Sequence, residues 1–138
     1  MTLKEFISKG DRFAAKAGAE LVSVKENCAT AQLLVTEEHL NAGGVCQGGA
    51  IFTVADVALA AVSNSNFMLT FAIDSSIFYH RSAMLGDLLT AEAVAVSMHP
   101  KIPYCEVKVK NQDGVLIASF QATCYNKRVP LEGIDALE

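Results

Sequence analysis

The chain has 138 residues, 51% of them hydrophobic, and a formal net charge of −4. This length predicts one domain over residues 1–138, and the hydrophobic content is too high for a disordered chain. The acidic balance excludes a nucleic-acid-binding surface, which requires a basic stripe. The four cysteines form no CxxC pair, so we expect free thiols, no metal site and a cytoplasmic protein.

The first 35 residues predict two short helices and a pair of strands. Apolar residues recur near helical spacing over residues 2–17, where Thr2 is a candidate cap and Gly10 divides the segment. This segment carries acids and no long apolar core, so we do not expect it to be a signal peptide. "LVSV" and "AQLLV" then predict two short strands, with the turn at Glu26–Asn27.

A glycine-rich loop and a nearly uncharged helix follow. Four glycines lie within residues 41–49, and residues 50–64 are apolar on almost every face. Such a pattern is typical of a helix with protein on all sides. Glycines and asparagines bound the helix and Asp56 interrupts it, so we expect a buried helix and not a membrane span. Asp56 is the only charged residue between Leu40 and Ile73.

The second half of the chain is rich in predicted strands. Apolar and polar residues alternate clearly in 87–99 and 104–110 and loosely in 68–80, and 115–127 is the expected returning strand. Asp113–Gly114 is a strong hairpin signal between the last two segments. Phe67, Phe71 and Phe78 are expected to be core and sheet residues, and one or two of them could instead line an acyl pocket. Residues 128–138 show no clear pattern.

This order of elements predicts an α+β fold. Short strands come first, one buried helix follows, and a four-strand meander completes an antiparallel sheet that packs over the helix. A single sheet curled around the helix would cover most of its surface. A second subunit would cover the rest.

Two stretches, "CQGGAIFTVADVALA" and "IDSSIFYHRSAMLGDLLTAEA", resemble the signature of hotdog-fold thioesterases. In that family a His-Gly-Gly opens the central helix, and an acid follows eight residues after the first glycine. Gly48 and Asp56 have this spacing, and Arg81-Ser82-Ala83 and Gly86-Asp87 match a later Arg-Pro-Ala and Gly-Asp. The similarity is closest to the phenylacetate-pathway and acyl-CoA thioesterase-13-like branch. It implies a hotdog fold, with a curved antiparallel sheet wrapped around one long central helix.

Two positions depart from the family pattern. Gln47 occupies the place of the signature histidine, and its side chain can donate a hydrogen bond but cannot carry a proton. Ala72 occupies the place of a serine or threonine that helps to hold water in some relatives, and Thr70 lies two residues earlier on the same strand face. The resemblance therefore leaves the reaction rate and the substrate open.

The resemblance assigns catalytic roles to four residues. The N-terminus of a helix presents free N–H groups and a favourable dipole, so the Gly48 N–H is the expected oxyanion donor, worth roughly 3–4 kcal/mol of barrier. In hotdog dimers each pocket takes this amide from one chain and the acid from the other. Asp56 would act as general base or as nucleophile through a mixed anhydride, and partial burial would raise its pKa. Asn41 would orient water or the thioester, and Gln47 would donate a hydrogen bond through its side-chain amide.

Five residues are expected to bind the substrate. Gly49, Thr70, Ala72, Arg81 and Ser82 lie in the two matched stretches or between them. The planar guanidinium of Arg81 suits the phosphates of coenzyme A. Because coenzyme A is part of the substrate, we expect no separate cofactor.

Simpler interpretations compete with these roles. A lone aspartate in a helix can bond a buried backbone group, and Asn41 can cap its own loop. Arg81 can be a solvated surface charge. Cys46 has no neighbouring histidine in the sequence to activate it, so it is interpreted as a small packing residue and not a nucleophile.

The leading functional hypothesis is an acyl-CoA thioesterase that acts on a medium-chain or aromatic acyl group. We expect a homodimer, assembled further as a dimer of dimers, with no nucleic-acid or membrane partner. The alternative is a non-catalytic acyl-CoA-binding hotdog module, which the departures at Gln47 and Ala72 favour. A hotdog dehydratase is disfavoured because no histidine lies between His39 and His80.

Overall fold

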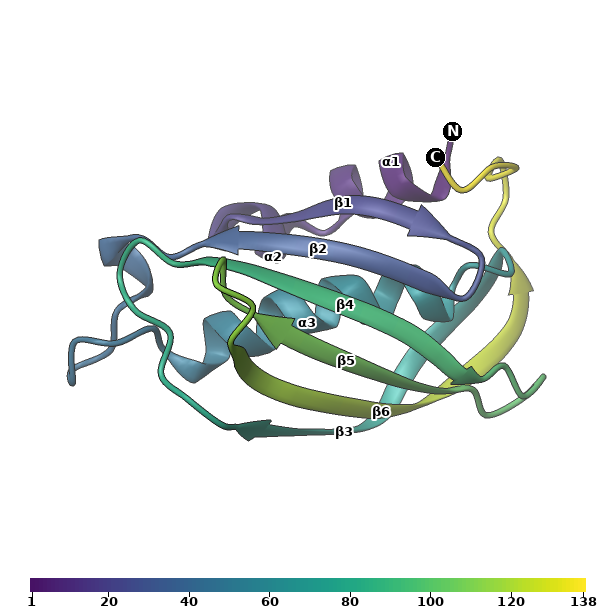
Figure 1. Ribbon diagram of the computed structural model, residues 1–138. Coiled ribbons are helices and arrows are strands. Elements are labelled where there is room, and N and C mark those ends of the chain that lie inside the picture. Colours follow the sequence, from purple (N-terminus) through teal and green to yellow (C-terminus); the bar gives the residue numbers. More distant parts are fainter.

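The computed structural model describes residues 1–138 as one curved antiparallel sheet around a long helix (Figure 1). This arrangement confirms the predicted α+β architecture. The elements follow in chain order as α1 (Leu3–Gly10), α2 (Arg12–Ala17), β1 (Ala19–Lys25), β2 (Cys28–Leu34), the 3-10 turn η1 (Glu37–His39), α3 (Gly48–Ser63), β3 (Met68–Tyr79), β4 (Leu88–Ser97), β5 (Tyr104–Lys110) and β6 (Leu116–Pro130).

Side-chain caps divide the N-terminal segment into two helices. The Thr2 hydroxyl accepts a hydrogen bond from the Glu5 N–H at 3.1 Å, and the Glu5 carboxylate accepts one from the Thr2 N–H at 2.9 Å, so a capping box starts α1. Asp11 caps α2 by accepting from the Ala14 N–H at 3.0 Å. The predicted division is confirmed, with Asp11 beside Gly10 as the residue that separates the helices. Both helices pack on β1 and α3 (Figure 1).

The strand order is β1-β2-β4-β5-β6-β3, and every neighbouring pair is antiparallel. The predicted four-strand meander is therefore wrong for β3, which pairs with β6 and not with β4. β2 and β5 occupy the two sides of β4, and β3 instead pairs along its length, from Met68 to Tyr79, with β6, which extends to Pro130. Residues 128–130 of the predicted unpatterned tail thus belong to a strand.

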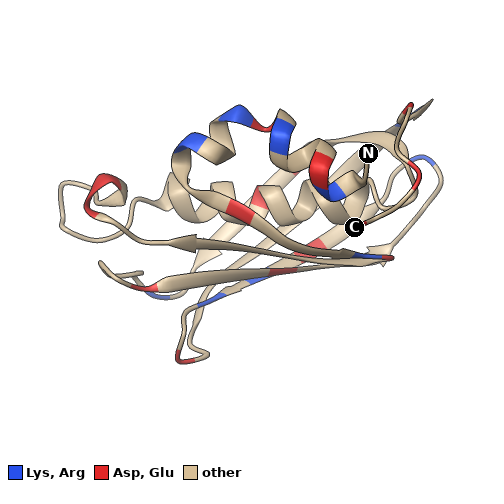
Figure 2. Ribbon diagram, turned by 90° about the horizontal axis from the view of Figure 1, so that it is seen from above, with Lys and Arg blue, Asp and Glu red and all other residues tan.

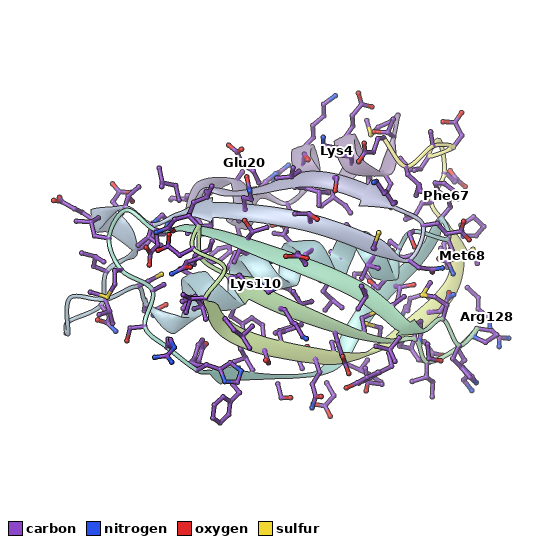
Figure 3. The ribbon with its side chains drawn as sticks, viewed as in Figure 1. Lys4, Glu20, Phe67, Met68, Lys110 and Arg128 are labelled. Atoms are coloured by element: carbon purple, nitrogen blue, oxygen red, sulfur yellow. The ribbon has the colours of Figure 1, made fainter.

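β3 forms one edge of the sheet, since only β6 pairs with it. Its apolar side chains are exposed in the single chain: Phe71 to 54%, Ile73 to 63% and Phe78 to 66%. Phe71 and Phe78 are thus sheet residues, as predicted, but they are not in the core. The strand starts where Phe67, Met68 and Arg128 lie together at one end of the molecule (Figure 3).

Helix α3 lies in the concave face of the sheet and carries much of the core. It starts two residues before the predicted boundary, and its buried residues are Ile51, Val54, Ala55, Val57, Ala58, Leu59, Ala61, Val62 and Ser63. One stripe remains uncovered: Gly49 and Asp56 are exposed, and Thr53 between them is half-buried. The single chain therefore does not surround α3 on all sides.

The charged residues are spread over α1, α2, the strands and the loops, whereas α3 carries only one, Asp56 (Figure 2). None of the helices combines the length and the continuous apolar character that crossing a membrane requires.

Candidate active site

The start of α3 is held firmly, yet its first two amides are free. The Cys46 N–H donates to the Ala83 carbonyl at 2.8 Å, and the Gln47 N–H donates to the His39 carbonyl at 2.7 Å. Gln47 is the N-cap residue, but its side chain makes no capping hydrogen bond. The N–H groups of Gly48 and Gly49 consequently donate to no protein group. Free N–H groups at a helix N-terminus favour negative charge on a ligand.

Tyr79, at the end of β3, packs directly on this helix start. Its hydroxyl donates to the Gly48 carbonyl at 2.9 Å. A Cβ atom on residue 48 would lie only 2.8 Å from the Tyr79 oxygen. Glycine at this position is therefore explained by close approach of a side chain from another element. The role of Tyr79 could not be predicted from the sequence, because no local spacing connects it with Gly48.

Two of the predicted substrate-binding residues share a cavity with Gly48. This cavity, of about 370 Å³, lies between the start of α3 and the end of β3, and its lining residues are Cys46, Gly48, Ile51, Tyr79, His80, Arg81 and Ser82. Arg81 and Ser82 are exposed at its mouth. The fold thus brings the Arg81 guanidinium and the Ser82 hydroxyl to the mouth of the cavity that Gly48 lines.

Gln47 and Gly49 line a second cavity, of about 490 Å³, between α2, η1 and the first turns of α3. Its apolar walls include Phe13, Leu40 and Ala50. The two cavities flank the start of α3. Of the predicted site residues, Gly48, Arg81 and Ser82 line the first cavity, and Gln47 and Gly49 line the second.

Asn41 is a loop-capping residue in this structure. Its side-chain oxygen accepts from the Gly43 N–H at 2.9 Å and from the Val45 N–H at 3.2 Å. Its backbone N–H donates to the Val45 carbonyl at 2.8 Å. The side-chain NH₂ group donates to nothing within the chain, so it remains free for a ligand while the oxygen shapes the loop.

Asp56 lies on the uncovered stripe of α3, two turns beyond Gly48. Eight residues at 1.5 Å each separate the two by about 12 Å along the helix axis. Within one chain, therefore, the Gly48 amide and the Asp56 carboxylate cannot contact the same carbonyl carbon. Burial raises the pKa of Asp56, and the nearby Asp11 carboxylate raises it further. Although the side chain is exposed in the single chain, enough protein surrounds the carboxyl group to disfavour its charged form.

Comparison with known proteins decides the family. The Thioesterase superfamily profile matches residues 43–118, which is more than half of the chain. The chain belongs to the Thioesterase superfamily. It is accordingly a thioester hydrolase, and the curved sheet around α3 is the hotdog fold of this superfamily.

Three relatives illustrate the similarity of this thioesterase to known proteins. An esterase candidate from Archaeoglobus fulgidus is 39% identical over 123 residues, which cover 89% of this chain and 80% of the relative. The acyl-coenzyme A thioesterase PaaI of Escherichia coli is 29% identical over 113 residues, which cover 82% of this chain and 81% of the relative. Its solved structure matches with a TM-score of 0.85 over 88% of each chain. A Streptococcus mutans protein, solved with acetyl-CoA bound, is 28% identical, with a TM-score of 0.77 over 81% of this chain and 90% of its own.

Two further predicted residues lie away from the start of α3 in this thioesterase chain. Thr70 is buried, and its backbone exchanges hydrogen bonds of 2.9 and 3.1 Å with the side chain of Asn64 at the end of α3. Its hydroxyl donates to the Met68 carbonyl at 3.1 Å. Ala72 is exposed on β3 and pairs with Cys124. A single chain therefore brings neither Thr70 nor Ala72 to Gly48.

Cys46 lies beside the first cavity but is poorly suited to attack a thioester. Its side chain is buried. Burial raises the pKa of the thiol, and the Asp87 carboxylate raises it further. The reactive form of cysteine is the thiolate. The interpretation of Cys46 as a packing residue therefore agrees with its surroundings.

Proposed function

We propose that this thioesterase hydrolyses acyl-CoA, using the Gly48 N–H of one chain and Asp56 of a second copy. The observation that carries the proposal is the free Gly48 amide at a cavity whose mouth holds Arg81. The similarity to the acyl-coenzyme A thioesterase PaaI and to a protein that binds acetyl-CoA supports coenzyme A as the thiol part. Arg81 would pair with its phosphates.

The acyl group is proposed to be medium-chain or aromatic. The cavity beside Gly49 has Phe13, Leu40 and Ala50 among its walls and a volume of about 490 Å³. This volume falls in the range of pockets that enclose small ligands. An apolar acyl chain or ring can occupy it while the thioester carbonyl lies at the start of α3.

The second copy is proposed to join through β3. The backbone groups along the free edge of this strand lack partners, and Phe71, Ile73 and Phe78 are exposed on it. An antiparallel β3–β3 contact about a twofold axis would pair the edge and cover these side chains. It would also place the uncovered stripe of α3 next to the other chain. A dimer of dimers would keep the same contact.

The reaction then has two routes, which both start at the carbonyl carbon. In the first, Asp56 takes a proton from water, and the water oxygen bonds to the carbonyl carbon. The resulting oxyanion is stabilised by the Gly48 N–H, the C–S bond breaks, and coenzyme A leaves as thiolate and is protonated. In the second, an Asp56 oxygen bonds to the carbonyl carbon, the C–S bond breaks and coenzyme A leaves as thiolate, and water then hydrolyses the mixed anhydride to the free acid and restores the Asp56 carboxylate. Mass spectrometry of the enzyme, quenched during turnover, separates the routes by the presence or absence of an acylated peptide.

Thiol release from a panel of acyl-CoA substrates tests the proposal. Wild type should release thiol, and Asp56→Ala should lower kcat by about 10²–10⁴-fold, the range for loss of a general base. Asp113→Ala, which removes an exposed carboxylate from the β5–β6 loop, is the matched control and should keep full activity. Acyl-CoA binding without thiol release would instead favour the non-catalytic binding module. Equal release by wild type and Asp56→Ala would contradict the assignment of Asp56.

A further inference from the structure

The Tyr79 hydroxyl bonds to the same peptide group that carries a free N–H. It donates to the Gly48 carbonyl at 2.9 Å. The Gly48 carbonyl and the Gly49 N–H belong to one planar, conjugated peptide unit. A hydrogen bond accepted by the carbonyl polarises that unit, and hydrogen bonds in a chain strengthen one another. The Tyr79 bond should thus make the Gly49 N–H a stronger donor.

The same contact also fixes the direction of the peptide. A Cβ atom on residue 48 would lie 2.8 Å from the Tyr79 oxygen and 2.9 Å from the adjoining ring carbon, so the phenol rests directly on Gly48. A phenol has an ordinary pKa of about 10, and burial raises that of Tyr79, so the hydroxyl keeps its proton and its bond at neutral pH. Tyr79 is the link between the edge strand β3 and the first turn of α3.

We propose that Tyr79 is a positioning residue, which aims and polarises the Gly48–Gly49 peptide so that the Gly49 N–H joins the Gly48 N–H in holding the oxyanion. The proposal rests on the proposed function, since it concerns the same carbonyl oxygen. It adds a second donor, Gly49, and gives β3 a role in the chemistry as well as in the sheet edge. Tyr79 itself contacts no reacting atom and acts through the peptide.

Tyr79→Phe tests this role, because it removes the hydroxyl and keeps the ring that packs on Gly48. Polarisation strengthens a hydrogen bond by about 10–30%, and one oxyanion donor contributes about 10²–10³ in kcat. We therefore expect kcat to fall by about two- to eightfold, with KM unchanged, because the donor acts mainly on the transition state. The amide ¹⁵N resonance of Gly49, which shares the polarised peptide, should shift more than that of Gly48.

Tyr104→Phe is the matched control. The Tyr104 hydroxyl also makes a single hydrogen bond, to the Gln121 side chain at 2.7 Å, and Tyr104 lies on β5, outside both cavities at the start of α3. It should leave kcat, KM and the Gly49 resonance unchanged. Wild-type kcat in Tyr79→Phe, an unshifted Gly49 resonance, or a rise in KM without a fall in kcat would overturn the positioning role. Absence of thiol release from wild type would instead overturn the proposed function, and the resonance shift would still decide whether the peptide is polarised.

Discussion

At the scale of single residues, the site depends on what surrounds one glycine and one aspartate. Gly48 has no room for a side chain because the Tyr79 phenol lies against it, and its amide has no partner in the chain. The surroundings of Asp56 disfavour its charged form, since burial and the nearby Asp11 carboxylate both raise the pKa of its side chain. A base with a raised pKa is better matched to reaction near neutral pH, but its charge is costly to the folded chain.

Asp56→Asn should therefore stabilise the protein at neutral pH while abolishing the base. Folding raises the Asp56 pKa, so the folded state binds this proton more tightly than the unfolded state does. This tighter proton binding stabilises the folded state. The stabilisation is complete at pH values below the unfolded-state pKa of Asp56, and it is lost as the pH rises through the folded-state pKa. Replacing the carboxylate removes the cost of its charge, so we expect Asp56→Asn to have the higher Tm at pH 7.

Thermal unfolding of wild type and Asp56→Asn from pH 3 to pH 8 measures this effect. The advantage of the variant should shrink as the pH falls, because the wild-type carboxyl group becomes neutral. Asp113→Asn, on an exposed loop, serves as control and should show no comparable trend. A wild type that is more stable than Asp56→Asn at pH 7 would mean that the ionised carboxylate is well compensated in the folded state.

At the scale of elements, β3 differs from every other strand of the sheet. It lies at one edge, it is exposed along most of its length, and its end contacts the start of α3 through Tyr79. The opposite edge, β1, is covered in part by α1 and by the C-terminal residue, since the Glu138 carboxylate accepts a hydrogen bond from the Val24 N–H at 2.6 Å. Natural sheets protect long apolar edges, so β3 is the edge that most needs a partner.

Ile73→Lys should separate the subunits. Ile73 is a large apolar residue in the middle of β3 and is 63% exposed, and like charges facing each other across a twofold contact repel. We expect light scattering to show a 14.7 kDa monomer for the variant and a larger species for wild type, together with loss of thiol release. Val22→Lys, which replaces an exposed apolar residue on β1, is the control and should keep the wild-type mass. A monomeric wild type with full activity would contradict a shared site.

At the scale of the whole molecule, the separation of Gly48 and Asp56 makes a single chain insufficient for the proposed chemistry. About 12 Å of helix lies between them, and the stripe that carries Asp56 is left uncovered. A twofold dimer contains two such sites, and each site takes Gly48 from one chain and Asp56 from the other. Two different inactive variants can therefore restore one site when they combine.

Gly48→Ala should inactivate the helix start, because its Cβ would lie only 2.8 Å from the Tyr79 oxygen and would displace one of the two groups. Mixing it with Asp56→Ala should recover activity that each variant alone has lost. In a mixed dimer one site carries both substitutions and the other carries neither. Random reassembly makes about half of the dimers mixed, so about one quarter of wild-type activity should return. Thiol release after unfolding and refolding the variants together measures this, and each variant refolded alone is the control. No recovery from a mixture shown to contain mixed dimers would place both residues of each site in one chain.

Most of the local structure could be predicted from the sequence, because its causes are local. Thr2 and Asp11 cap their own helices, Asn27 turns the first hairpin with a positive φ, and alternation marks β4 and β5. The thioesterase superfamily was predicted from a resemblance, which the spacing of Gly48 and Asp56 carried together with the later Arg81-Ser82-Ala83 and Gly86-Asp87 and the order of the strands. The position of β3 could not be predicted, because alternation describes the faces of a strand and not its neighbours.

By itself, the sequence determined which segments are helix and strand, which helix is buried, and which aspartate stands alone in apolar surroundings, since hydrophobic periodicity, caps and turns act over a few residues. Only the tertiary structure decided that β3 closes the sheet against β6, that Thr70 is held by Asn64 away from Gly48, and that Tyr79 rests on the first turn of α3. These contacts join residues from different elements. Their geometry depends on the curvature of the sheet and the packing of α3 within it, and no local pattern contains that information.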